Sequence, residues 1–257
     1  MARSDSLQST RLAFLSERRV YRDAVELGLV GLAFLLYFIV RANVIDRPDV
    51  ALANARQVVD IEQSLGIFAE PSWQQAILGS DVLVRFFNFV YFWLDFPLIA
   101  ALGLWMYARR QPQYTFTRDA ILFSGALALI AYNLFPVAPP RLLPEAGLMD
   151  TLQVFNNASY QAQSTQFFVN PYAAVPSLHV GWAVLVATGM VLAFPRNRLV
   201  LLMALAHVLA QSSSTVFTGN HYFLDGAAGL LAASGGLAFA TFMQRRGYAY
   251  LRRATSN

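Results

Sequence analysis

Residues 199–243 read LVLLMALAHVLAQSSSTVFTGNHYFLDGAAGLLAASGGLAFATFM, two long apolar runs separated only by Thr218-Gly219-Asn220. A helix needs about 20 mainly apolar residues to cross a bilayer, and the runs 199–217 and 221–243 are both close to that length. So short a connection joins helices that run antiparallel to each other. The stretch therefore predicts two neighbouring membrane spans that form a tight helical hairpin.

The rest of the chain has the same apolar character. Hydrophobic residues make up 56% of the 257 residues and charged residues only 13%, about half of the roughly 25% that is usual in soluble domains. The mean hydropathy is +0.44. This composition excludes a disordered chain and an ordinary cytosolic fold. We predict an all-α polytopic membrane protein, a bundle of six transmembrane helices whose other spans are 24–44, 86–107, 120–137 and 175–194.

The basic residues predict how these spans are oriented. All 19 are arginine, and five of them fall on one side of the predicted spans: Arg41, Arg47, Arg56, Arg85 and Arg141. The other 14 fall on the opposite side, which the positive-inside rule makes cytoplasmic. We therefore expect a multi-pass protein of the cell membrane with both termini in the cytoplasm. Residues 1–22 form a cytoplasmic segment, 23–244 the membrane domain and 245–257 a basic tail, while 45–85 and 138–174 face outward.

Two further features of the composition exclude classes of function. The arginines are scattered between apolar runs rather than gathered in one stripe, so a nucleic-acid partner is not expected. The chain has no cysteine, which excludes a thiolate nucleophile and a cysteine-ligated metal or cluster. The first span is interpreted as a retained anchor, because Asp5 and Glu17 precede it and no small-residue cleavage site follows.

The first outer segment, 45–85, predicts two short helices. Apolar residues recur in it at helical spacing with polar residues between them, which is typical of a helix lying in the membrane interface. The apolar residues are Ala51, Ala55, Val58, Ile61 and Leu65, and the polar ones are Arg56, Asp60 and Glu62. Gly66 is a suitable terminator, and Glu70-Pro71-Ser72 is a suitable start for a second helix around Trp73.

Three polar clusters lie at the predicted outer ends of the helices. The first is the proline-rich run 135–144, FPVAPPRLLP, whose prolines stiffen the backbone around Arg141. A guanidinium on a rigid loop is suited to bidentate capture of a phosphate. The alternative is an arginine that anchors the loop to lipid headgroups.

The second cluster, Pro176-Ser177-Leu178-His179, opens the fourth span. The free amides of a helix start, together with the Ser177 hydroxyl, form a site for an anion. His179 lies where it could donate a proton to such a ligand. The alternative reading is that Ser177 is a simple helix cap and His179 an interfacial histidine.

The third cluster opens the sixth span, where His221 and Asp225 are spaced i, i+4 on one helical face. A carboxylate bonded to one ring nitrogen fixes the tautomer and leaves the other nitrogen as nucleophile or base. Asn220 precedes them, and Ser214 and Thr215 end the preceding span. Those two hydroxyls could bind a phosphate or simply bond to their own backbone.

Together, Pro-Pro-Arg141, Pro-Ser-Leu-His179 and His221-x-x-x-Asp225 resemble the three signature motifs of the type-2 phosphatidic acid phosphatase superfamily, over roughly residues 20–245. The residues of these motifs are most similar to those of its inositol phosphorylceramide synthase-like branch, in which the second motif has leucine in place of glycine. The stretches Glu62…Leu65-Gly66-Ile67-Phe68…Glu70 and Asn88…Tyr91…Phe96-Pro97 also resemble bacterial members of that branch. Two cationic positions of the superfamily are absent, because Leu134 and Thr215 stand where a lysine and an arginine are usual.

The resemblance implies an enzyme that needs no metal or cofactor. His221, oriented by Asp225, attacks phosphorus and forms a phosphohistidine, and His179 serves as general acid and then base. Arg141, Ser177, Ser214, Thr215 and Asn220 bind the substrate phosphate. The expected partners are membrane lipids, a lipid phosphoester and a hydroxyl acceptor, namely inositol, a sugar or water. Transfer of a phosphate or an inositol phosphate-like headgroup is favoured, and the alternative is hydrolysis of a lipid phosphate or prenyl (pyro)phosphate.

Other readings of the polar residues are weaker. A transporter needs a polar path to the inner face, whereas the predicted inner halves of these helices consist mainly of Leu, Ala, Val and Phe. A haem protein would use histidines as axial ligands, but His207 lies at a different depth from His179 and His221. His207 is interpreted as a packed core histidine, and the role of Asp95 in the second span is open. The sequence gives no oligomeric state.

Overall fold

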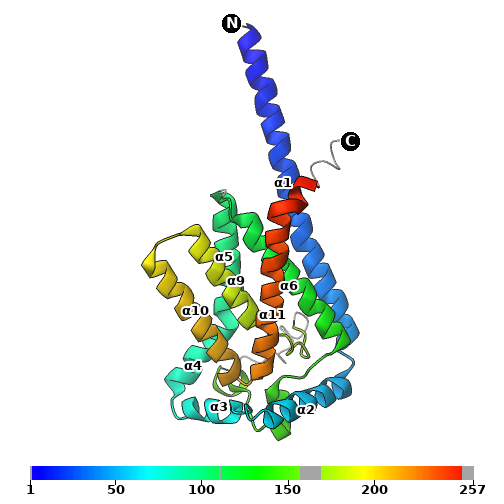
Figure 1. Ribbon diagram of the computed structural model, residues 1–257, viewed down its shortest axis with the longest axis vertical. Coiled ribbons are helices and arrows are strands. Elements are labelled where there is room, and N and C mark those ends of the chain that lie inside the picture. The colour runs from blue at the N-terminus through cyan, green and yellow to red at the C-terminus, as the bar shows by residue number, and fades with distance from the viewer. Residues whose placement is uncertain (1, 110, 157–168, 251–257) are drawn as a thin grey trace. The chain divides into compact units, whose positions relative to one another are not determined.

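The computed structural model describes residues 2–109, 111–156 and 169–250, whose regular elements are helices joined by turns and loops (Figure 1). These residues contain no strand, only an isolated bridge between Val137 and Ala173. The α-helices are α1 (Ala2–Val44), α2 (Pro48–Ser64), α3 (Glu70–Leu78), α4 (Asp81–Phe89), α5 (Asp95–Ala108), α6 (Tyr114–Leu134), α7 (Thr151–Asn156), α9 (Leu178–Ala193), α10 (Arg198–Phe217) and α11 (Phe223–Phe242). The chain divides after Val40 into two compact units, and the three polar clusters all belong to the second.

The helices support a membrane protein, but they do not confirm six spans. Among the described residues, four helical segments are long and apolar enough to cross a bilayer: Val20–Val44, Asp81–Ala108, Arg198–Phe217 and Phe223–Tyr250. α9 is apolar but shorter, because Pro176 and Ser177 precede its first turn. α6 is long enough but carries Arg118 and Asp119, which lower its hydropathy.

α10 and α11 follow each other across a five-residue turn, but they do not form the tight hairpin that the sequence predicts, because each packs mainly against other helices, α9 among them. α9 packs against α5, α6, α10 and α11, and α11 packs also against α6. α9 and α11 approach each other closely. A Cβ atom built on Gly229 would lie 2.1 Å from the carbonyl oxygen of Ser177, so only glycine fits there. These contacts bring the starts of α9 and α11 together with the ends of α6 and α10.

The two short helices predicted in the first outer segment are present as α2 and α3, which lie across the ends of α10 and α11 (Figure 1). Gly66 follows α2 with a φ of 70°, a left-handed conformation that glycine adopts without strain. α3 begins at Glu70 with Pro71 in its first turn, as expected.

The buried face of α2 differs from the predicted one. Ala51, Ala55 and Val58 are buried as expected, but Ile61 is 49% exposed and Leu65 61% exposed. Glu62, which was predicted on the polar face, is completely buried. The reason is that Glu62 forms a hydrogen bond to the start of α11, so the helix turns its acidic residue inward at its last turn.

Candidate active site

Backbone hydrogen bonds join the three loops that carry the polar clusters. Between the first and second clusters, Val137 N–H donates to Tyr172 O at 3.1 Å and Ala174 N–H to Val137 O at 3.2 Å. Arg141 N–H donates to Gly219 O at 2.9 Å, which joins the first cluster to the third. Ser177 N–H donates to Asp225 O at 2.9 Å and joins the second to the third. The clusters are distant in sequence, yet they form one site.

His221 lies just before α11, and its hydrogen bonds define its tautomer. Its Nδ1 atom lies 3.0 Å from Ala174 O and 3.2 Å from Asp225 Oδ2. A backbone carbonyl can only accept a hydrogen bond, so Nδ1 must carry the proton. The other nitrogen, Nε2, therefore has its lone pair available. With its side chain 5% exposed and that of Asp225 fully buried, this ring is held out of bulk water.

His179 faces His221 from the first turn of α9. The two ring centroids are 5.6 Å apart, with the planes inclined by 55°. Tyr91 stacks on the imidazole of His179, with 4.3 Å between the ring centroids and 21° between the planes. Tyr91 belongs to a π-helical turn, Val90–Leu94, that joins α4 to α5, and such turns occur frequently at functional sites.

Arg141 is the cation of the site. Its Nη1 donates to Asn220 Oδ1, beside His221, and its Nε lies 3.2 Å from Asp150 Oδ2. The guanidinium side chain is only 7% exposed. The structure thus brings Arg141, His179, His221 and Asp225 together, and it places Asn220 as a partner of the arginine. The catalytic and phosphate-binding roles of these residues stay predictions.

The three predicted hydroxyl ligands all have local hydrogen bonds. Ser177 Oγ accepts from Val180 N–H at 3.4 Å and caps α9. Ser214 and Thr215 donate to the carbonyls of Gln211 and Ser212, each at 2.7 Å. Of the alternatives that the sequence left open, the structure therefore shows the local one, and phosphate binding by these hydroxyls stays a prediction.

Four residues around the site were not assigned roles from the sequence, namely Glu62, Glu70, Tyr91 and Asp150. Asp150 carries no signal in its own segment, because its pairing with Arg141 depends on how the outer loop folds. For Glu62 a signal did exist: it lies four residues after Val58, on the same face of a helix. Burial and a side-chain hydrogen bond to Glu70 raise the pKa of Glu62 to about 9.

The two positions that depart from the superfamily pattern lie differently in the structure. Leu134, where a lysine is usual, is 72% exposed at the end of α6. Thr215, where an arginine is usual, is buried and donates to its own helix. Neither residue supplies a cation, so Arg141 is the guanidinium that the described structure places beside His221.

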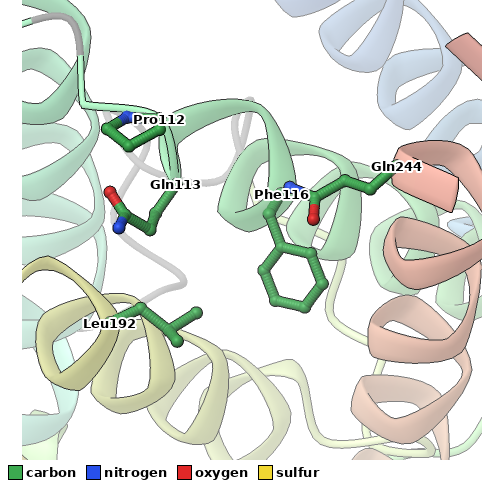
Figure 2. Close-up of a pocket in the computed structure, with 5 residues that line it drawn as sticks. All are labelled: Pro112, Gln113, Phe116, Leu192 and Gln244. Carbon is green, nitrogen blue, oxygen red and sulfur yellow. The ribbon is translucent and has the colours of Figure 1, made fainter.

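A pocket of about 400 Å³ lies away from the polar clusters, between the start of α6 and the end of α9 (Figure 2). It is lined by Pro112, Gln113, Phe116, Leu192 and Gln244. None of these five side chains is an acid, a base or a cation, so this pocket cannot supply the chemistry of the polar site. In the described ranges no three His, Asp or Glu side chains are grouped as ligands for a metal ion.

His207 and Asp95 are two further buried polar residues of the apolar helices. His207 is buried on α10, and neither of its ring nitrogens has a hydrogen-bond partner among the described residues. Asp95 is buried at the start of α5, and within the same residues its Oδ1 atom has none either. Nothing in the structure gives either residue a role.

A family model described as the PAP2 superfamily matches residues 56–239, which include all three polar clusters. No curated protein and no solved structure matches the chain significantly. The match confirms the superfamily that the motifs resemble, but not the synthase-like branch. Membership points to phosphatase or phosphotransferase chemistry in a membrane protein. Because the match covers well over half of the chain, this protein belongs to the PAP2 superfamily.

Proposed function

We propose that the protein is a membrane phosphotransferase that moves a phosphate or a phospho-headgroup from a lipid phosphoester to a hydroxyl acceptor. The observation that carries this proposal is the hydrogen bonding of His221. Its Nδ1 proton is directed at Ala174 O and Asp225 Oδ2, which leaves Nε2 as a nucleophile.

In the first step, the Nε2 lone pair of His221 forms a bond to phosphorus, and the bond from phosphorus to the leaving oxygen breaks. His179, in its protonated form, gives its proton to that oxygen. As positive charge develops on the His221 ring, the Asp225 carboxylate stabilises it. The product of this step is a phosphohistidine and a free lipid alcohol.

In the second step, His179 takes the proton of the acceptor hydroxyl while the acceptor oxygen bonds to phosphorus. The phosphorus–nitrogen bond breaks, and its electron pair returns to Nε2 of His221. The ring separation of 5.6 Å leaves the two histidines close enough to act on opposite sides of one phosphorus atom. Arg141 and the amides at the start of α9 supply fixed positive charge to the phosphate oxygens.

An inositol or sugar hydroxyl is the acceptor that we favour, because the residues of the three motifs resemble those of the synthase-like branch. Water is the alternative acceptor, and it would make the protein a lipid phosphate or prenyl (pyro)phosphate phosphatase. We further propose six membrane spans, with α6 and α9 completing the four candidates, and α2 and α3 lying in the outer interface. Both termini are then cytoplasmic, and the site opens toward the outer leaflet.

The test is to incubate the purified protein with lipid phosphates, prenyl phosphates and phosphatidylinositol, with and without inositol. Free phosphate and new lipid products are both measured. We expect His221→Ala to lower turnover by at least roughly 10³-fold, because the nucleophile is lost, and to abolish the acid-labile phosphoenzyme. His207→Leu is the matched control, because His207 is the third histidine of the chain and does not belong to the site. This variant should retain turnover and the acid-labile phosphoenzyme. Turnover by His221→Ala at the wild-type rate would end the proposal.

A second test asks whether activity depends on a metal ion. Because Arg141 and helix-start amides carry the charge of the phosphate in this mechanism, activity should persist in a strong chelator. The measurement is the initial rate before and after dialysis against chelator. Loss of activity that added magnesium or another divalent ion restores would contradict this part of the proposal.

A further inference from the structure

Three buried carboxylates hold the start of α11. Glu62 Oε1 accepts from Leu224 N–H at 2.7 Å, and Glu70 Oε1 accepts from Phe223 N–H at 2.8 Å. Asp225 Oδ2 accepts from Tyr222 N–H at 2.9 Å. The first four amides of a helix have no partner within the helix, and these bonds satisfy three of them at the start of α11.

Two of these caps are unlike an ordinary helix cap. The usual cap is a nearby serine, threonine, aspartate or asparagine, as Asp225 is here. Glu62 and Glu70 come instead from α2 and α3, 162 and 153 residues away from the amides that they bind. Both glutamates are completely buried. Burying a carboxylate in this way is costly, and a local cap would have satisfied a helix end at less cost.

The two glutamates also contact each other. They accept from adjacent amides of α11, and among the described residues no donor reaches either Oε2 atom. Two buried carboxyl groups side by side do not both ionise readily, because like charges repel and burial disfavours the charged form, so one of the pair holds a proton. The groups that face this carboxyl pair, Glu62–Glu70, are Asp225 and Tyr222 of α11, and the exposed ion pair Arg56–Glu145 lies farther out.

We infer that Glu62 and Glu70 are positioning residues, and that by sharing one proton they fix the first turn of α11 and with it His221 and Asp225. The inference rests on the proposed function, because it assigns the pair to the nucleophile of that reaction. His221 immediately precedes the capped turn, and Asp225 lies within it. Movement of this turn therefore moves Nε2 relative to phosphorus, and a displacement of about 1 Å can lower a rate by roughly 10²-fold.

The shared proton makes the positioning dependent on pH. Burial and Glu70 raise the pKa of Glu62 from its ordinary 4.5 to about 9. The folded state therefore binds this proton more tightly than the unfolded state does, and the stability that it contributes is full below pH 4.5 and is lost as the pH rises through about 9. Once the proton leaves, two anions face each other beside Asp225 and repel.

The experiment compares Glu62→Gln and Glu62→Ala with the wild type and with Asp60→Asn, a control at an exposed position of the same helix. Glutamine can accept from Leu224 N–H and donate to Glu70 without titrating. We expect Glu62→Gln to keep kcat within about 3-fold at neutral pH and to lose the alkaline fall in kcat near pH 9 that the wild type and Asp60→Asn show. Glu62→Ala should lower kcat by about 10- to 100-fold and change KM little.

A second readout does not require activity. Hydrogen exchange of the backbone amides of Phe223 and Leu224 should be faster in Glu62→Ala than in the wild type, and unchanged in Glu62→Gln. If no substrate is turned over, the proposed function fails, while exchange still tests the carboxyl pair. The inference is overturned if Glu62→Gln retains the alkaline fall in kcat, or if the exchange of these amides is the same in all four proteins. If Glu62→Ala does not fold, Glu62→Gln decides through its pH profile.

Discussion

Asp225 accepts two hydrogen bonds through one oxygen atom, Oδ2, from the His221 ring and from Tyr222 N–H. In Asp225→Asn the amide oxygen can occupy that place and keep both bonds, so that only the charge is removed. The Nδ1 proton stays in position as well, because Ala174 O also accepts from it. A hydrogen bond to a charged group is worth about 1.5–3 kcal/mol, and kcat should therefore fall by roughly 10- to 150-fold. Steady-state kinetics on the substrate identified above checks this, and a loss as complete as that of His221→Ala would show that Ala174 does not hold the tautomer.

Tyr91 gives His179 a flat surface on one side. An aromatic pair of this kind is worth about 0.5–1.5 kcal/mol beyond its buried area. Tyr91→Phe retains the ring and should keep kcat within roughly 2-fold, whereas Tyr91→Leu should lower it by roughly 2- to 12-fold with little change in KM. The comparison of kcat and KM for the two variants is the measurement. Equal loss in both variants would assign the effect to the hydroxyl rather than to stacking.

The residues with the clearest chemistry were the ones that the sequence could predict. His221 and Asp225 were paired by their i, i+4 spacing, and the structure places them in hydrogen-bond contact. Ala174 O could not be predicted, because a backbone acceptor has no side chain to mark it. Asp150 was missed for a related reason, since its contact with Arg141 depends on a loop whose fold no periodic pattern describes.

At the scale of helices, the site depends on how closely α9 approaches α11. A methyl group on Gly229 would collide with the carbonyl of Ser177, and backbone atoms cannot move aside as a flexible side chain can. Overpacking of this kind costs about 1–3 kcal/mol. Gly229→Ala should therefore lower the thermal unfolding temperature in detergent, and it should lower kcat because Ser177 N–H would lose Asp225 O. Gly226→Ala is the matched control on the same helix, as its Cβ would meet only Val180 at 3.7 Å. Equal stability of the two variants would contradict the close contact.

The existence of the helices was easier to predict than which faces they bury. Apolar length alone indicated α10 and α11, though not that they pack mainly against other helices instead of each other. Glycine and proline marked the ends of α2 and α3 correctly. The buried stripe of α2 was predicted from hydrophobicity, which assigns Glu62 to water. Its buried hydrogen bond to Leu224 N–H outweighs that preference, and such a long-range contact is invisible to a local pattern.

At the scale of the whole molecule, the absence of cysteine allows the proposed topology to be tested with single cysteines. Ser64 is exposed at the end of α2, close to the side of the histidines because Glu62 contacts α11. Gln244 is exposed just beyond α11, at the opposite end of that helix. If the site faces outward, a membrane-impermeant maleimide should label Ser64→Cys on intact cells, and Gln244→Cys only after the membrane is permeabilised. The unmodified protein gives the background. The reverse labelling pattern would place the site at the cytoplasmic face, and labelling of both positions on intact cells would mean that α11 does not cross the membrane.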